Sequence, residues 1–187
     1  MSDARIESAV RSILKSLGED PRREGLRRTP SRVTRAWREL TSGYREEKNI
    51  DSLFRGRLFK VDYNEMVTVR DIQFYSLCEH HMLPFFGTAT IAYVPDGRVV
   101  GLSKIPRLVR IFASRLQVQE RMTQQIAETL QRHLKPLGVG VIITARHLCM
   151  EMRGCRSQLS PTVTSAMLGC FRRDPRTRDE FLRLAGK

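Results

Sequence analysis

The sequence predicts an α+β fold with a mainly antiparallel sheet, and two observations support this. From about residue 58 onward, stretches rich in β-branched and aromatic residues follow one another in hairpin-like runs. Two consecutive stretches with helical spacing, at 105–112 and 122–134, stand between the earlier strands and the later ones. A parallel sheet would instead alternate one helix with each strand, so this order favours an antiparallel arrangement.

The N-terminal part is predicted to be helical. Residues 4–17 carry apolar side chains at helical spacing, and Gly18 ends that pattern. Thr29 and Pro30 resemble an N-cap followed by a first-turn proline, and they begin a second helix that stops near Gly43.

The part of the chain after residue 57 is expected to begin with strands. The predicted strands share a β-branched or aromatic composition and lie at 58–71, 73–77, 88–94, 99–102, 139–152 and 162–168. Pro95-Asp96-Gly97 marks a turn, Pro136-Leu137-Gly138 closes the second internal helix, and a short helix at 176–185 ends the chain. We therefore divide the sequence into an N-terminal helical region, 1–57, and a domain over 58–187 that contains the predicted sheet, which together form one structural unit.

The composition fits a globular protein. The 187 residues are 41% hydrophobic and 28% charged, which excludes a disordered chain. No apolar run approaches the roughly 18 residues of a membrane helix, and the N-terminus lacks the pattern of a signal peptide, so we expect a cytoplasmic protein. The net charge of +13 suits nucleic acid or a small polyanion such as a nucleoside triphosphate, but a solvated basic face would give the same total.

Cysteines and histidines gather at two places in the sequence. Cys78 and His81 are three residues apart, which lets one turn of backbone bring both to a single ion. His147 and Cys149 lie two residues apart in the predicted strand 139–152, so they are expected to project from the same face. Without a secretory pattern, the cysteines are expected to stay reduced or to bind metal.

Sulfur and imidazole ligands favour zinc among the common ions. With Cys78, His81 and Cys149 as ligands, a fourth position would be left for water, as in catalytic zinc sites. His80 and His147 would stand beside the metal, where groups that titrate near neutrality can transfer protons. Two other interpretations stay open at this point: a closed structural site with His147 as the fourth ligand, and unligated core cysteines with hydrogen-bonded histidines.

Four further cysteine, histidine and glutamate residues are interpreted as structural. We expect His133 to lie on a helix surface, and Cys155 and Cys170 to be small packing residues. Glu79 is expected to be structural or to orient a ligand.

Five motifs follow one another along the chain. They are Cys78-Glu79-His80-His81, Gly101-Leu102-Ser103-Lys104, Gln117-Val118-Gln119-Glu120-Arg121, His147-Leu148-Cys149 and Arg153-Gly154. Through these motifs the sequence resembles the GTP cyclohydrolase I family, and the similarity extends from about Thr29 to Leu182. Five motifs in register are far more specific than any one of them.

The resemblance implies a fold, an assembly and an activity. The fold would be the tunnelling fold, in which units of an antiparallel four-stranded sheet with two consecutive helices assemble into barrels. The assembly would be a toroidal homodecamer with active sites between subunits. The activity would be the zinc-dependent hydrolytic opening of the guanine ring of GTP by water. It would release formate and form 7,8-dihydroneopterin triphosphate, in the first step of tetrahydrofolate and pterin biosynthesis.

The resemblance also implies which residues hold the metal and move protons. Zinc would be held by Cys78, His81 and Cys149, and it can lower the pKa of bound water to about 7. His80 and His147 would be the acid–base pair. Attack at carbon 8 of guanine needs a proton on nitrogen 7, which His80 could supply, and His147 could serve the proton transfer that accompanies ring opening.

Further residues would bind GTP. Glu120 would accept hydrogen bonds from the amide and amino groups of guanine, with Gln119 beside it, and adenine would leave that carboxylate unpaired. The ribose and triphosphate would be lined by Ser103, Lys104, Arg107 and Arg153. Arg32 and Arg35 would reach the phosphates from a neighbouring subunit, since arginine binds phosphate oxygens in bidentate fashion.

Several of these residues also have a structural alternative. Glu120 stands near a helix start, where the helix dipole favours carboxylates. Ser103 could be only the N-cap of the following helix. The arginines could be solvated helix charges; they are Arg32, Arg35 and Arg107.

Three features depart from the family pattern. Glu151 is expected to share a strand face with Arg153 and to pair with it, which would weaken the grip of Arg153 on phosphate. Cys155 lies close enough to compete for the metal or to be oxidised. Leu159-Ser160-Pro161 forms an unusual loop.

Two other classes of function remain open on the sequence. One is another tunnelling-fold enzyme, such as a nitrile reductase or a different pterin-forming cyclohydrolase. The other is a basic zinc module that binds nucleic acid. The second is disfavoured because the basic residues are not interleaved with aromatic residues.

Overall fold

The structure is a computed structural model that describes residues 3–158 and 160–186. These residues form two compact units, one up to Ser42 and one from Gly43 onward, and each is considered by itself. Within the described part of the chain, no helix has the length and apolar character needed to cross a membrane.

The first unit is a pair of helices, α1 (Asp3–Ser16) and α2 (Thr29–Leu40). Gly18 follows α1 with a φ of +83°, a conformation that glycine adopts readily, as predicted for a helix end. Thr29 is the first residue of α2 and Arg28 is its N-cap, so the predicted cap is one residue off.

The second unit opens with short helical segments. They are α3 (Gly43–Glu46), the 3-10 helix η1 (Glu47–Asn49) and α4 (Ile50–Phe54). Two short strands, β1 (Leu58–Lys60) and β4 (Arg98–Val100), then pair with each other as a small antiparallel sheet. The prediction of one strand over 58–71 was wrong, because the polar segment around Asp62 and Asn64 separates β1 from the next strand.

The main sheet contains four long strands, each antiparallel to its neighbour. They are β2 (Val67–Cys78), β3 (Pro84–Val94), β6 (Gly138–His147) and β7 (Thr162–Gly169). A two-residue strand, β5 (Leu116–Gln117), pairs in parallel with the end of β2. The described sheet therefore has the order β5-β2-β3-β6-β7, with five strands where the resemblance implied four.

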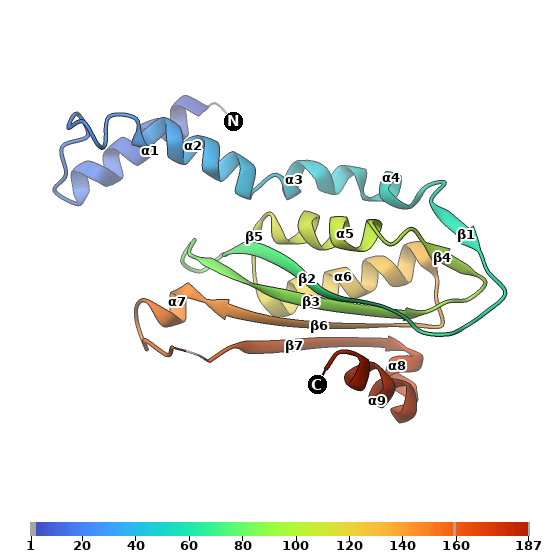
Figure 1. The fold of residues 1–187 in the computed structure, drawn as a ribbon. Coiled ribbons are helices and arrows are strands. Elements are labelled where there is room, and N and C mark those ends of the chain that lie inside the picture. Colours follow the sequence, from blue (N-terminus) through green and yellow to red (C-terminus); the bar gives the residue numbers. More distant parts are fainter. Residues whose placement is uncertain (1–2, 159, 187) are drawn as a thin grey trace. The chain divides into compact units, whose positions relative to one another are not determined.

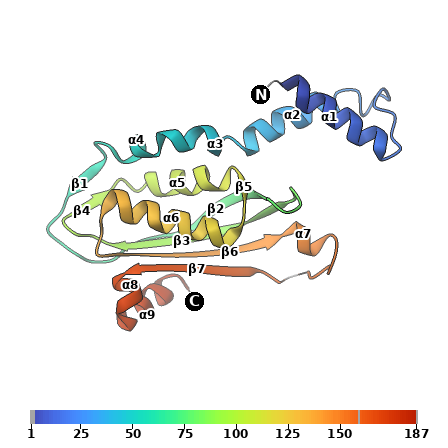
Figure 2. The same cartoon turned by 180° about the vertical axis from the view of Figure 1, so that it is seen from behind.

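Two helices cover one face of this sheet, as Figures 1 and 2 show. They are the two consecutive helices predicted from the sequence, α5 (Lys104–Ala113) and α6 (Gln119–Leu134). Alternate residues of the strands, such as Ile91 and Ile143, are fully buried against them. On the other face, α8 (Cys170–Arg173) and α9 (Pro175–Leu184) pack on the intervening residues, including Ala92 and Ile142. The α+β prediction is confirmed.

The long strand predicted at 139–152 is interrupted. Strand β6 ends at His147, and one helical turn, α7 (Leu148–Glu151), follows it directly. The β-branched residues that favour a strand stop at Thr144, and the turn is made of Leu148-Cys149-Met150-Glu151, which has none. Neighbouring side chains on α7 therefore do not alternate between two faces.

Gly87 provides a test of the pairing between β3 and β6. A Cβ atom at Gly87 would lie 1.9 Å from the carbonyl oxygen of Thr144 and 2.7 Å from the Cα of Ala145. We expect Gly87→Ala to lower the free energy of unfolding by at least about 1–3 kcal/mol, because the rigid backbone of β6 must shift. The measurement is the urea midpoint of the variant against that of the parent.

The matched control is Gly101→Ala. A Cβ atom there would meet only the ring of Phe59, at 3.8 Å. We expect a change within about 0.5 kcal/mol. Equal midpoints for the two alanine variants would contradict the close approach at Gly87.

Candidate active site

The connection between β2 and β3 brings Cys78 and His81 to the same place. The backbone N–H of Cys78 donates to the carbonyl of Leu83 (2.8 Å), and the N–H of Met82 donates back to the carbonyl of Cys78 (2.7 Å). Met82 has a φ of +55°, which lets the chain reverse into β3. The N–H of Glu79 donates to the carbonyl of Gln117 in β5, so the loop is also held from its other side.

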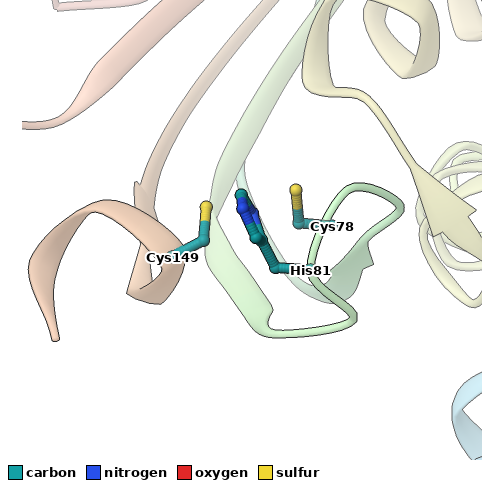
Figure 3. Close-up of side chains that lie close together, drawn as sticks. All are labelled: Cys78, His81 and Cys149. Carbon is teal, nitrogen blue, oxygen red and sulfur yellow. The ribbon is translucent and has the colours of Figure 1, made fainter. Parts of the chain in front are cut away.

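Cys149 reaches this place from the helical turn α7. The ligand atoms of Cys78, His81 and Cys149 all lie within 4.8 Å of one another. Figure 3 shows the three side chains converging from the end of β2, the following loop and α7. The three predicted ligands are thus together, but the reason given for Cys149, side-chain alternation along a strand, was wrong.

The chemistry of these donors fits a zinc ion. Burial raises the pKa of the Cys149 thiol, and the neighbouring Cys78 raises it further. Two cysteines and a histidine form a donor set of the kind that zinc prefers, since zinc favours sulfur and imidazole ligands. The distances among the three donors suit a single ion with one position open.

Arg153 interacts with one of these donors. Its Nη1 lies 3.0 Å from Nε2 of His81, and because a guanidinium only donates, that nitrogen must accept. If His81 bound a metal through Nε2, the lone pair of Nε2 would be taken by the metal and could not accept from Arg153. If it bound through Nδ1, Nε2 would carry a proton. Arg153 must therefore move away from Nε2 when His81 binds a metal.

A pocket of about 300 Å³ adjoins the three donors. Its lining combines the metal-site residues with the start of α6 and the end of β6: Cys78, His80, His81, Gln117, Val118, Gln119, Glu120, His147, Cys149, Met150 and Thr162. The predicted acid–base pair, His80 and His147, thus shares one cavity with the carboxylate of Glu120. Glu120 is exposed and lies in the first turn of α6.

His147 is not among the three clustered donors and has contacts of its own. Its ring stacks on Phe85 with centroids 4.7 Å apart and an interplanar angle of 2°. Its Nε2 lies 2.7 Å from Oε1 of Gln119. Burial lowers the pKa of His147, against an opposing effect of Glu120 and Glu151, so the neutral imidazole is favoured. This arrangement gives no support to a closed four-ligand site that includes His147.

Two acidic residues near the site form ion pairs with arginines. Glu151 pairs with Arg146, with its Oε1 2.9 Å from Nε of that arginine. The expected pairing of Glu151 with Arg153 was wrong, because α7 turns Glu151 away from the predicted strand face. Glu79 pairs with Arg121 on α6 and so ties the loop to the helix, which agrees with a structural role.

Three of the predicted phosphate-binding residues, Ser103, Lys104 and Arg107, lie at or near the start of α5. Ser103 is the N-cap of this helix, although its side chain makes no capping hydrogen bond, and Lys104 is its first residue. The helix rises about 15 Å over its 10 residues before the chain reaches β5 beside Cys78. Ser103, Lys104 and Arg107 therefore do not line the pocket that holds the histidines. In Figure 1, α5 begins beside β4 and ends toward β5.

Arg57 lies beside this second group and was missed by the sequence analysis. Its carbonyl accepts a hydrogen bond from the N–H of Gly101 (3.3 Å), where β1 and β4 pair. Desolvation lowers the pKa of Lys104, and the charges of Arg57 and Arg107 lower it further. The strand pairing that joins these positions has no signature in the local sequence.

Other predicted residues lie elsewhere. Arg32 and Arg35 are exposed on α2, in the first unit. Cys155 is exposed, so its assignment as a packing residue was wrong. His133 is largely buried, with its ring 4.9 Å from that of Phe54, so it is not a surface residue. In the loop 159–161, Leu159 lies outside the described residues.

Comparisons with known proteins agree with this geometry. The sequence profile described as GTP cyclohydrolase I matches residues 6–186. The chain belongs to the GTP cyclohydrolase I family. It is 57% identical over 182 residues to GTP cyclohydrolase 1 of Chlorobium chlorochromatii, which covers 97% of this chain and 81% of that protein.

Other members of the GTP cyclohydrolase I family are similarly close. The GTP cyclohydrolase 1 of Leptospira biflexa is 55% identical, over 96% of this chain and 97% of its own. That of Campylobacter jejuni is 54% identical, over 96% and 94%. Among solved structures, the apo form of archaeosine synthase QueF-Like matches 59% of this chain and 97% of its own, with a TM-score of 0.45 and 15% identity.

The metal site can be tested without any activity assay. We expect the purified chain to hold about one zinc ion, and Cys149→Ser to lose it, because a serine hydroxyl is a poor zinc ligand. Elemental analysis after gel filtration measures this. Cys155→Ser is the matched control: it removes an exposed thiol six positions away and should keep its zinc. Equal zinc contents in the two variants would contradict the assignment of Cys149.

Proposed function

We propose that this chain, as a member of the GTP cyclohydrolase I family, opens the guanine ring of GTP by hydrolysis. The products are formate and 7,8-dihydroneopterin triphosphate. The observation that carries the proposal is the single pocket in which Cys78, His81 and Cys149 meet two histidines and the exposed carboxylate of Glu120.

Zinc is the proposed metal, held by Cys78, His81 and Cys149. When bound there, it would supply Lewis-acid chemistry that makes water a nucleophile near neutral pH. The donor set supports zinc over magnesium or calcium, which prefer oxygen ligands.

The proposed proton transfers belong to His80 and His147. His80 protonates nitrogen 7 of guanine, which makes carbon 8 electrophilic, and His147 serves the later transfer when the ring opens. Both residues line the pocket, and the lowered pKa of His147 leaves it able to accept a proton near neutrality.

Glu120 is the proposed guanine-recognition residue. Its carboxylate accepts from the ring N–H and the amino group of guanine, and adenine lacks that pair of donors. The position of Glu120 on the wall of the pocket, in the first turn of α6, supports this role.

The triphosphate is proposed to be bound by a second copy of the chain. Ser103, Lys104 and Arg107 lie at the far end of α5 from the metal-site pocket, so a neighbouring copy must supply them to complete the site. The remaining proposed phosphate contacts are Arg153, Arg32 and Arg35. A ring-shaped homo-oligomer, with a decamer as the proposed size, provides such head-to-tail contacts between copies.

The activity is tested by incubating the zinc-loaded protein with GTP. We expect formate and, after oxidation, a fluorescent pterin. His80→Ala should reduce turnover by about 100-fold or more, since general acid–base catalysis contributes about 10²–10⁴-fold. Its zinc content should stay that of the parent. Absence of formate from a zinc-replete parent would rule out the proposed reaction, and loss of zinc from His80→Ala would make His80 a ligand.

The shared site is tested by mixing two inactive variants. His147→Ala damages the metal-site pocket and Lys104→Ala the phosphate-binding end, so each alone should be nearly inactive. When the two are co-expressed, random assembly leaves about a quarter of the sites with two intact halves, and activity should return to about that level. The double variant His147→Ala/Lys104→Ala, mixed with inactive His147→Ala, is the control. No recovery in the first mixture would place both halves of the site in one chain.

A further inference from the structure

Gln119 lies at the centre of a buried hydrogen-bond network. Its side chain is at the start of α6, and the residue is only 1% exposed. Its Nε2 lies within hydrogen-bonding distance of the carbonyl of Ile143 (3.1 Å), the carbonyl of Thr162 (3.0 Å) and the hydroxyl of Thr164 (3.1 Å), and its two N–H groups are shared among these three acceptors. Its Oε1 faces Nε2 of His147. Every polar atom of this side chain is therefore engaged within the protein.

The network allows only one orientation of the Gln119 amide. If the amide were turned over, its oxygen would face the two backbone carbonyl oxygens of Ile143 and Thr162, which can only accept. The end of the amide that faces these carbonyl oxygens must therefore be the nitrogen, and the end that faces His147 must be the oxygen Oε1.

This orientation decides which nitrogen of His147 carries the proton. A carbonyl oxygen can only accept, so Nε2 of His147, 2.7 Å away, must be the N–H donor. In the neutral ring, Nδ1 is then the unprotonated nitrogen. The ring of His147 stacks on that of Phe85, with centroids 4.7 Å apart and an interplanar angle of 2°, which fixes the plane of the imidazole. The hydrogen bond to Gln119 fixes its rotation within that plane.

We propose that Gln119 is a positioning residue that fixes the tautomer and orientation of His147, and that it does not bind guanine. This inference rests on the proposed function, because it assigns His147 the proton transfer that Gln119 supports. It differs from the role that the family resemblance implied for Gln119, which was to contact the substrate beside Glu120.

The neighbouring residues explain why two adjacent positions take different roles. Consecutive residues of a helix point about 100° apart, and both residues contribute to the pocket lining. The Gln119 amide, however, is buried and hydrogen-bonded to the sheet, whereas Glu120 is exposed. The hydroxyl of Thr123, one turn farther along α6, lies 2.7 Å from the backbone carbonyl oxygen of Gln119. It also lies 2.7 Å from the hydroxyl of Thr164. Thr164 on β7 therefore contacts the amide nitrogen directly, and Thr123 on α6 contacts Thr164.

The first test needs no variant and no turnover. Histidine labelled with ¹⁵N in the zinc-loaded parent, in slightly alkaline solution, should show His147 with a protonated Nε2 and an unprotonated Nδ1. His147→Ala assigns the signal by its disappearance. The opposite tautomer, or an even mixture of the two, would overturn the proposal whether or not the protein turns over GTP.

The second test separates positioning from substrate binding. Gln119→Met keeps the length of the side chain but removes the acceptor, so His147 should populate both tautomers. Loss of such an orienting partner should lower kcat by about 10–100-fold. The KM for GTP should change less than about twofold, because the substrate contacts remain. Glu120→Gln, at the next position, is the matched variant and should raise KM.

A double variant completes the argument. In the His147→Ala background, Gln119→Met should cause little further loss of kcat, because the group it positions is gone. An unchanged kcat with a raised KM in Gln119→Met, or a full additional loss in the double variant, would assign Gln119 to the substrate instead.

If Gln119→Met does not fold, Thr164→Val, which removes one acceptor of the amide, should give a smaller effect in the same direction. Absence of formate from the parent would count against the proposed function and would leave the tautomer measurement intact.

Discussion

The site depends on the register in which β3 and β6 pair. In this register Phe85 lies opposite His147, so the aromatic ring that stacks on the imidazole comes from the strand that also begins just after the Cys78–His81 loop. Residues on a strand alternate between faces, and a slip by one residue would turn His147 away from the pocket. Gly87, two residues farther along β3, lets the two backbones approach closely at this end. The metal-site pocket is thus a consequence of how the sheet is packed.

Much of this could be predicted from the sequence, because some features are local. The three-residue spacing of Cys78 and His81 suits a tight loop, and the two helical periods at 105–112 and 122–134 correspond to α5 and α6. Cys149 was assigned correctly to the cluster for the wrong reason. The end of β6 at His147 depends on α7, a single turn whose four residues are too few to produce a helical period.

The rest depends on contacts between residues far apart in the chain. Nothing near Gln119 indicates that it meets the carbonyls of Ile143 and Thr162, because that contact follows from how α6 lies on β6 and β7. The partner of Glu151 changed from Arg153 to Arg146 once one turn of helix replaced strand. Likewise, the burial of His133 follows from its stack on Phe54 of α4, an element that precedes it by a long stretch of chain. Tertiary contacts of this kind override local patterns.

The position of β7 in the sheet has a consequence for handling the protein. Among the described strands, β7 pairs only with β6, so one edge of this eight-residue strand leaves its backbone N–H and C=O groups without a strand partner. Such an edge is a template for pairing with another polypeptide. Incorrect pairing of this edge between chains becomes more frequent as chains meet more often, so refolding yield is expected to fall as the chain concentration rises. The unpaired edge of β7 is therefore expected to contribute to aggregation of this chain.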